Sequence, residues 1–233
     1  QAVCSASDSS FISGPYTFTL LCSVSSAPFF DDFEGHTPSV NIVQTNCWDA
    51  IGTTIGYDWN IDGMASTPSL NTGPSGAYSG VNYAYVEASS GTTGSSALFE
   101  SPLIDLSSLT NPQLDFYYHM FGVDMGDLHI SIYDGSNWIT MDSIMGQQQT
   151  AETDPWLNRI LPLSNFSGDT IRVRFISYKT ATGFTGDVSI DDFRIGEAPN
   201  CPQPAFLNAF NINPNSATLT WTPTGSESSW ALY

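Results

Sequence analysis

The chain contains 233 residues, of which 41% are hydrophobic, 13% aromatic and only 12% charged. This composition supports a buried core and argues against a wholly disordered chain, and no apolar run approaches the ~18–20 residues that a membrane-spanning helix needs. The 23 acidic and 5 basic residues give a net charge of −18, and the basic residues all lie in one late stretch: Arg159, Arg172, Arg174, Lys179 and Arg194. Such a surface repels phosphate backbones and anionic lipids, which argues against nucleic-acid binding and membrane insertion and favours a divalent cation as partner.

The cysteines indicate the cellular compartment. Cys4, Cys22, Cys47 and Cys201 form an even set in an acidic, lysine-poor chain. This predicts two disulfides in an extracellular or cell-surface protein, the alternative being free thiols in a cytosolic one. The first residue, Gln1, fits an N-terminus left by signal-peptide removal. Several pairings are open, and we favour Cys4–Cys22 with Cys47–Cys201.

Apolar and polar residues alternate with a period of two from about residue 83 onward. The run from Leu114 to Met120 shows this pattern, and similar runs follow at residues 128–132 and 171–175. Each pattern is typical of a strand with one buried and one solvent-facing side. We therefore predict an all-β fold, an antiparallel two-sheet jelly-roll sandwich. Residues 1–28 form an N-terminal segment with at most one strand, to which we assign no role.

The last predicted strand changes phase near Asp191 and Asp192. Its apolar residues fall on one parity up to Ile190 and on the other from Phe193 onward, so an extra residue must be accommodated between them. A β-bulge at the two aspartates explains this slip. Continuing the parity of Ile190 would turn Asp192 inward, and a buried carboxylate needs a partner or a metal ion.

A proline-rich linker is predicted at residues 197–204. Beyond it, residues 205–233 contain a strand-like run that ends at Trp221, for which we expect a buried side chain. This stretch is too short to fold as an independent sandwich. We therefore expect the N-terminal part of a second, incomplete β-sandwich that continues past Tyr233.

Several ordered motifs resemble the MAM domain, an extracellular module named after meprin, the A5 antigen (neuropilin) and a receptor phosphatase. They include Phe30-Asp31-Asp32-Phe33-Glu34, Cys47-Trp48, Ala97-Leu98-Phe99-Glu100-Ser101-Pro102, Leu114–Gly122 and Gly186–Phe193. The resemblance covers residues 29–196. Residues 72–74 and the cysteine before Trp48 resemble a bacterial branch of the family, and the mid-domain cysteines of animal members are absent, so their disulfide pattern does not transfer. The tail from Cys201 to Trp230 resembles the start of a fibronectin type III domain, a tandem common in secreted proteins of the Bacteroidetes.

Calcium is the cofactor that the sequence favours, in a structural role. Residues 58–63 match the first half of an oxygen-ligand loop, with Asp58 and Asp62 as ligands. The glutamate that would complete an EF-hand loop is missing, and an ordinary polar turn explains the motif equally well. Domains similar to this one often hold a cation between their first and last strands, which points to Glu34 and Asp192, and we favour this pair. The alternative is an exposed Glu34 and an Asp192 that only caps the bulge by hydrogen bonding.

Catalytic constellations are scarce. The histidines share no metal-binding spacing: His36, His119 and His129. We expect the last two to lie on the solvent-facing side of their strands. No G-x-S-x-G nucleophile motif is present, and Glu100, Asp124 and Asp127 show no spacing that singles out a glycosidase pair. We predict that this region is not an enzyme, while a parent protein could carry a catalytic domain elsewhere.

Aromatic residues offer a binding surface instead. Several cluster among glycines and serines: Tyr57, Trp59, Tyr78, Tyr83 and Tyr85. Tyr117 and Trp138 are further candidates for exposed rings. Sugar rings and protein partners both use such surfaces. Large sandwiches also bury aromatic rings, and we expect Trp48, Trp59 and Trp221 to be mostly structural.

Together these features predict a non-catalytic adhesion or recognition module of a larger secreted or cell-surface protein. Its partner would be an extracellular protein or a glycan. Two alternatives stay open: a carbohydrate-binding accessory domain of a secreted hydrolase or protease, and a self-associating structural component of an extracellular filament. A fold alone does not choose among them.

Overall fold

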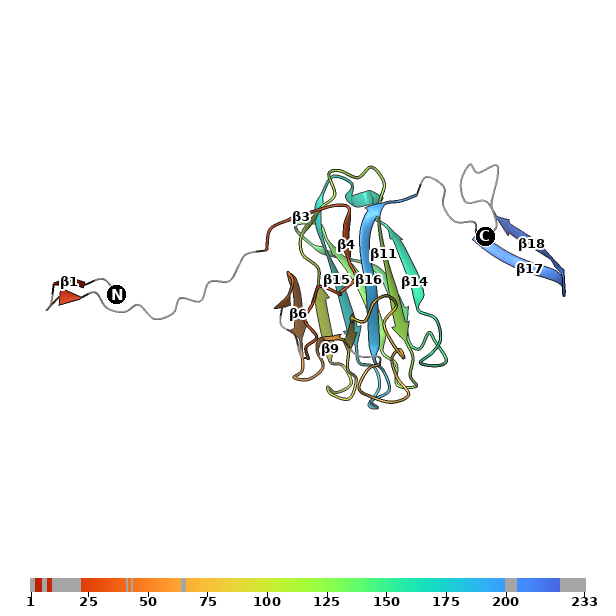
Figure 1. The fold of residues 1–233 in the computed structure, drawn as a ribbon, viewed down its shortest axis with the longest axis horizontal. Helices are drawn as coiled ribbons and strands as arrows, with labels where there is room; N and C mark the ends of the chain where they lie inside the picture. Colours follow the sequence, from red (N-terminus) through yellow and green to blue (C-terminus); the bar gives the residue numbers. More distant parts are fainter. Residues whose placement is uncertain are drawn as a thin grey trace.

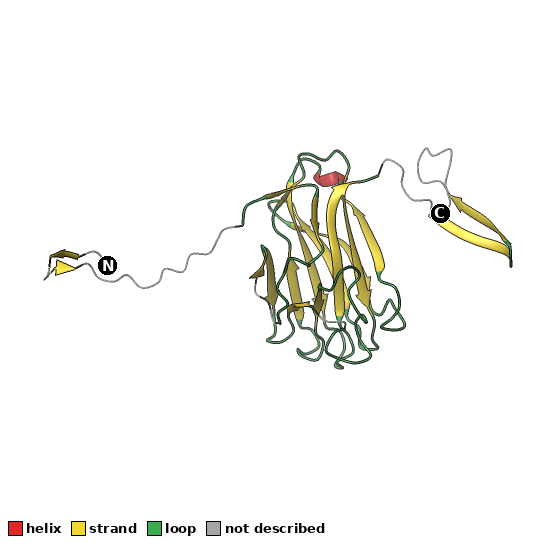
Figure 2. Cartoon of the chain, in the orientation of Figure 1, coloured by secondary structure: helices red, strands yellow, loops and turns green. Residues whose placement is uncertain are grey.

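The computed structural model describes residues 3–5, 8–9, 22–40, 42, 44–63, 66–199 and 205–222. Two β-sheets pack face to face into a sandwich, which confirms the predicted all-β class (Figure 1). Among the described residues the one helical turn is a 3-10 helix, η1 (Ser164–Phe166), and most loops gather at the opposite end of the sandwich (Figure 2). No helix in this part of the chain has the length and apolar character to span a membrane.

Sheet I contains eight strands: β3 (Ser25–Ser26), β5 (Gln44–Thr45), β6 (Trp48–Gly52), β9 (Ser96–Glu100), β10 (Ile104–Asp105), β12 (Asp127–Tyr133), β13 (Trp138–Met145) and β15 (Thr170–Tyr178). Its main order is β13-β12-β15-β9-β6-β5, with β10 between β15 and β3. Sheet II contains six strands: β4 (Phe29–Asp31), β7 (Trp59–Asp62), β8 (Tyr83–Val86), β11 (Pro112–Met120), β14 (Leu157–Pro162) and β16 (Val188–Glu197). Its order is β14-β11-β16-β8-β7, and β4 also pairs with β16.

Two further pairs lie outside the sandwich. They are β1 (Val3–Ser5) with β2 (Asp8–Ser9), and β17 (Ala205–Asn213) with β18 (Ser216–Thr222). Among the described strands, β17 and β18 pair only with each other. Trp221, which we expected to be buried, is half-buried.

The predicted alternation places the core. On β11, Leu114, Phe116, Tyr118 and Met120 are all buried between the sheets, as their parity predicted. The apolar residues of β12 and β15 at the alternating positions are buried as well. Burial of each such side chain stabilises the fold by roughly 1.5–3 kcal/mol.

An aromatic cluster fills one part of this core. The ring of Trp48 stacks on Phe99 at 4.5 Å between centroids and meets the edge of Phe193 at 5.0 Å. Phe33 packs against the same indole at 5.6 Å. The structural role predicted for Trp48 and Trp59 is confirmed, because both side chains are completely buried.

The predicted bulge is confirmed, but a different aspartate is buried. The register between β11 and β16 shifts between Asp115 and Tyr117, which face Arg194 and Asp191. Asp192, with φ at +48°, is the inserted residue, and it is half-buried. Asp191 is the fully buried carboxylate, because the segment at Tyr78 and Ser79 lies over it and donates two backbone N–H groups to it.

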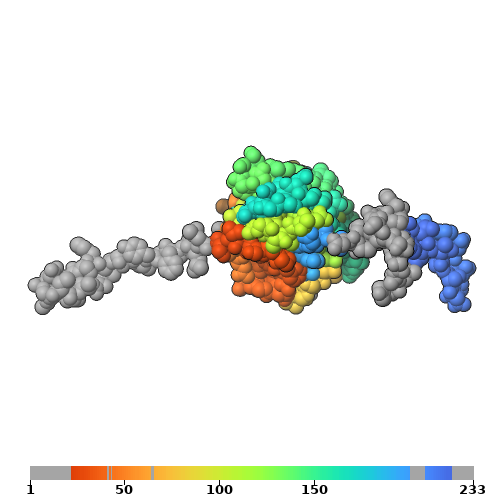
Figure 3. Space-filling model, turned by 90° about the horizontal axis from the view of Figure 1, so that it is seen from above, coloured from red at the N-terminus to blue at the C-terminus, as the bar shows by residue number. Residues whose placement is uncertain are grey.

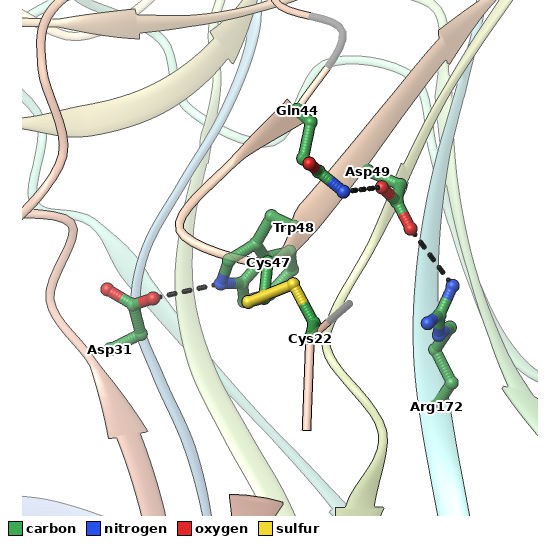
Figure 4. The surroundings of a disulfide bond; sticks show 7 residues. All are labelled: Cys22, Asp31, Gln44, Cys47, Trp48, Asp49 and Arg172. Atoms are coloured by element: carbon green, nitrogen blue, oxygen red, sulfur yellow. Dashed lines mark hydrogen bonds and ion pairs between the residues drawn. A yellow bond between two sulfur atoms is a disulfide. The ribbon is translucent and has the colours of Figure 1, made fainter. Parts of the chain in front are cut away.

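The predicted disulfide pairing is wrong. Cys22 bonds to Cys47, with their Cα atoms 5.6 Å apart (Figure 4). The physical reason is that β3 pairs with β10, so the sandwich begins before residue 29 and holds Cys22 beside the turn that enters β6. Seen from above, this red starting segment lies against the yellow-green segment near β10 (Figure 3). Cys201 and the side chain of Cys4 lie outside the described residues.

The expected exposure of His119 is also wrong. Its side chain is completely buried. Residues 149–156 fold over the outer face of β11 at this point, where Gln149 accepts a hydrogen bond from the backbone of Met120 and Trp156 packs on the imidazole at 5.7 Å. His129, in contrast, is half-buried and contacts Ser143.

Candidate functional site

A groove of about 740 Å³ lies on the outer face of sheet II. Four neighbouring strands and one loop supply its main side chains: Gln113, Asp115 and Tyr117 from β11, Asn158 and Ile160 from β14, Asp192 and Arg194 from β16, Phe30 from β4, and Tyr78 from the loop before β8. The outward positions of β11 alternate with its core positions, so the pattern that builds the core also builds the floor of the groove.

Strand register fixes one row of side chains across the groove. Asp115 lies opposite Ile160 on one side and opposite Arg194 on the other, and Arg194 lies opposite Phe30. The row therefore crosses four strands, from the edge strand β14 to the edge strand β4. At the ordinary spacing of strands it spans about 14 Å.

Two tyrosine rings form a preformed stack in this groove. Tyr78 and Tyr117 lie with centroids 3.5 Å apart and planes 12° apart. The neighbouring side chain of Tyr78 raises the pKa of Tyr117 to about 12, with burial as a second cause. The backbone N–H of Tyr78 donates to the Asp191 carboxylate at 2.9 Å, so both the ring and the backbone of this residue are held in place.

Asp115 is the centre of a polar network in the groove. Its carboxylate lies 3.8 Å from the guanidinium of Arg194, and the side-chain amides of Asn158 and Gln113 are its polar neighbours. Burial raises the pKa of Asp115, and these three neighbours oppose the rise. The network fixes side chains that would otherwise be mobile on an open sheet.

The segment from Tyr78 to Asn82 is tied down by carboxylates. Glu34 accepts the backbone N–H groups of Val81 and Asn82 at 2.8 and 2.6 Å, and Asp192 accepts the hydroxyl of Ser79 at 2.7 Å. Burial raises the pKa of the neighbouring Asp191 to about 8, against the effect of the N–H groups that it accepts.

Gly80 permits this close approach. It has φ at +60°, and a Cβ atom there would stand 2.4 Å from the Glu34 carboxyl carbon. The two residues of the favoured metal pair, Glu34 and Asp192, therefore both contact the segment at residues 78–82. Backbone N–H groups of this segment donate hydrogen bonds to Glu34, and a hydroxyl group donates one to Asp192. In the part of the chain that the structure describes, no three His, Cys, Asp or Glu side chains gather as a metal ion would need. Calcium at this place stays a prediction.

The second candidate pair for calcium, Asp58 and Asp62, also stays a prediction. Residues 59–62 form strand β7, in which all four side chains are buried. Asp58 lies in the bend just before this strand, and Asp62 is its last residue. Asp58 accepts the N–H of Gly56 at 3.1 Å, and Asp62 accepts the hydroxyl of Tyr83 at 3.0 Å.

The aromatic residues singled out in the sequence divide into two groups. Four are buried in the body of the sandwich: Tyr57, Trp59, Tyr83 and Tyr85. Tyr78 and Tyr117 line the groove, whereas Trp138 lies on β13 in sheet I with the Arg174 guanidinium 3.5 Å above its ring. Sequence reasoning missed Phe30 and Arg194 as groove residues, because only the strand register brings them to the same row.

The carboxylates considered as a glycosidase pair have structural partners. Glu100 accepts hydrogen bonds from Arg174, with 2.8 Å between the Nε and Oε1 atoms. Asp124 accepts the hydroxyl of Thr185 at 2.6 Å, and Asp127 accepts the N–H of Gly146 at 3.0 Å. Each contact ties a strand or loop to its neighbour.

The chain folds as a two-sheet β-sandwich domain with a groove on the outer face of one sheet. The sequence profile described as "MAM domain, meprin/A5/mu" matches residues 44–202. The chain belongs to this family, which confirms the resemblance found in its motifs.

A relative and two solved structures are similar to the chain. Neuropilin-1a of Danio rerio is 28% identical to this chain over 144 residues, which are 60% of the chain. The match covers only 15% of the length of that relative. The K2 cleaved adhesin domain of Lys-gingipain has a TM-score of 0.50 at 14% identity, covering 73% of this chain and 98% of that one. The K1 domain, from Porphyromonas gingivalis W83, has a TM-score of 0.48 at 15% identity with the same coverage. These structural likenesses describe the fold alone.

Proposed function

We propose that this chain is a non-catalytic recognition module of an extracellular protein and that the groove on sheet II holds its partner. The observation that carries the proposal is the preformed Tyr78–Tyr117 stack beside the Asp115 network. Side chains already fixed in place lose little conformational entropy when a partner binds. Membership of a family of extracellular modules and the Cys22–Cys47 disulfide support the location.

A non-catalytic role is supported by the surroundings of the acidic groups. In the groove, Asp115 faces Arg194, and Asp192 accepts the Ser79 hydroxyl. The Glu197 carboxylate accepts the N–H groups of Thr110 and Asn111. Carboxylates so occupied serve as structural acceptors rather than as general acids or bases.

We also propose that the module sits in a multidomain, surface-displayed protein of bacterial type, where it mediates adhesion. The pair β17–β18 would begin a fibronectin III-like domain after the linker. Support comes from its self-contained pairing and from the exposure of nearly all its described side chains, as expected for strands whose partner sheet lies elsewhere. Accessory binding differs from adhesion in that a hydrolase or protease domain belongs to the same protein, and filament assembly differs in that the partner is a second copy of the chain.

A binding array tests the proposal. The full chain is applied to immobilised collagen, fibronectin and laminin and to a glycan panel, and the Phe30→Ala variant is compared with Phe184→Ala. These two rings are matched, because each is 55% exposed and only Phe30 lines the groove. We expect Phe30→Ala alone to weaken the captured interaction. Equal binding by both variants would show that the groove is not the contact surface, and a concentration-dependent dimer in sedimentation would instead favour assembly.

A further inference from the structure

We propose that the groove binds an internal stretch of a neutral polysaccharide, an inference that rests on the proposed function of the groove as the binding surface. The ligand class follows from three properties of the groove. These are its aromatic rings, its mixture of hydrogen-bond donors and acceptors, and its charge.

The rings suit the apolar faces of sugars. Phe30 is 55% exposed and Tyr78 is 41% exposed, although both side chains are largely apolar. Exposed aromatic surface of this kind marks a contact site, because it gains by being covered. The stack on Tyr117 fixes the plane of the Tyr78 ring, and a flat, immobile ring is a platform for a flat, rigid ligand.

The polar side chains suit hydroxyl groups. Arg194 presents N–H donors, Asp192 presents carboxylate oxygens, and the amide groups of Gln113 and Asn158 each carry donors and an acceptor. A hydroxyl group both donates and accepts, so a row of sugar hydroxyls can satisfy this mixed set. A purely cationic or purely anionic ligand would satisfy only half of it.

Charge favours a neutral ligand. The net charge of −18 repels polyanions such as acidic polysaccharides. A basic peptide would meet the Arg194 guanidinium and would compete for the Asp115 carboxylate that Arg194 already faces. Both oxygens of Glu197 are bonded to backbone N–H groups, which leaves few free carboxylate oxygens for lysine or arginine side chains.

The position of the groove favours the interior of a chain over its end. The row from Ile160 to Phe30 begins on one edge strand of sheet II and ends on another. A polymer lying along this row can therefore leave the sheet at both edges. A pocket for a terminal sugar would need a wall, and the row reaches edge strands at both its ends.

Affinity electrophoresis of the full chain tests the inference. Each gel contains one polysaccharide: a soluble β-glucan, a galactomannan or an arabinoxylan as a neutral probe, or polygalacturonate as an anionic probe. In a separate experiment, a peptide rich in lysine and arginine is titrated into the chain by calorimetry. We expect retardation by at least one neutral polysaccharide, with Kd raised about tenfold or more in Phe30→Ala and Gln113→Ala and changed less than about twofold in Phe184→Ala. Thermal melts of each variant verify folding. Isolated monosaccharides should bind far more weakly than hexasaccharides of the same sugar.

The outcomes separate this inference from the proposed function. Retardation by polygalacturonate alone, or binding of the basic peptide alone, would overturn the neutral polysaccharide while leaving the groove as the contact surface. The neutral polysaccharide would also be overturned, and the groove kept as the contact surface, if no polysaccharide retards the chain but Phe30→Ala abolishes binding to an arrayed protein. Retardation that persists unchanged in both groove variants would overturn the inference and the proposed function together.

Discussion

The Asp31 carboxylate accepts a hydrogen bond of 2.8 Å from the indole nitrogen of the buried Trp48 (Figure 4). The same carboxylate lies 3.0 Å from the imidazole of His36 and accepts the N–H of Phe33 at 2.9 Å. Asp31 ends β4 in sheet II and Trp48 begins β6 in sheet I. One acidic side chain therefore joins the two sheets beside the Cys22–Cys47 disulfide.

Replacing Asp31 should destabilise the sandwich strongly. We expect Asp31→Ala to lower the free energy of unfolding by about 2–4 kcal/mol, because several donors would be left without an acceptor. Urea unfolding followed by tryptophan fluorescence measures the loss. Asp32→Ala is the matched control, since among the described residues that carboxylate accepts only the nearby N–H of Glu34, at 3.1 Å. Equal losses in the two variants would contradict a bridging role for Asp31.

The disulfide can be checked chemically. A non-reducing peptide map should show Cys22 cross-linked to Cys47, whose sequence separation is 25 residues. Closing a loop of this length stabilises a fold by about 3 kcal/mol, so Cys22→Ser should lower the melting temperature clearly. The corresponding change at Cys4 serves as comparison. A free thiol at position 22 or 47 in the native protein would contradict this pairing.

His119 should make the sandwich sensitive to acid. Burial lowers the pKa of His119 from 6.5 to about 4, so between these pH values the unfolded chain binds a proton that the folded chain does not. Stability from this group is present above pH 6.5 and is lost as the pH falls toward 4, by roughly 2–3 kcal/mol. His119→Gln should remove this part of the slope in urea titrations from pH 7 to pH 4. Parallel profiles for wild type and variant would show that the imidazole does not titrate as described.

Lys179 should stabilise the loop end of the sandwich. It is the only lysine in the chain, its side chain is buried, and its ammonium donates to the carbonyl oxygens of Ala88 and, at 2.7 Å, Gly183. We expect Lys179→Met to lower the free energy of unfolding by about 2–3 kcal/mol, because both carbonyls lose a charged donor. Arg194→Met removes a side chain that is 54% exposed and whose guanidinium lies 3.8 Å from its partner, so it should cost less than about 1 kcal/mol. The opposite ranking in urea unfolding would contradict this assignment.

The ammonium also acts on the buried Asp187. Burial and the nearby Glu87 raise the pKa of Asp187 to about 7, and Lys179 opposes the rise. The Lys179→Met variant should therefore titrate Asp187 at a still higher pH. Carbon-detected NMR of the aspartate carboxyl groups measures this shift directly.

The calcium prediction has its own test. If a cation joins Glu34 to Asp192, chelation should lower the melting temperature by several degrees, because ligand binding is linked to folding. Glu34→Gln should abolish the effect of the chelator. A melting temperature unchanged by chelation would leave both carboxylates with the backbone and hydroxyl donors already described.

The sequence predicts the core better than the groove. Alternation from Leu114 to Met120 depends on the strand alone, and it is confirmed residue by residue. The burial of His119 depends on residues 149–156 folding over β11, a contact that no local pattern encodes. Likewise Asp115, Arg194 and Phe30 are far apart in the chain and meet only through register. The phase slip at Asp191 and Asp192 reveals the bulge, but the burial of Asp191 depends on contact with the distant segment at Tyr78 and Ser79.

The distribution of basic residues has a consequence for survival outside the cell. Proteases that cleave after lysine or arginine need an accessible, extended segment, and none of the first 158 residues offers either side chain. The five that follow are Arg159, Arg172, Arg174, Lys179 and Arg194; the arginines lie within strands β14, β15 and β16, and the lysine is buried. No surface loop between residues 22 and 199 carries an exposed basic residue. Trypsin-like enzymes should therefore cut the folded sandwich far more slowly than the unfolded chain.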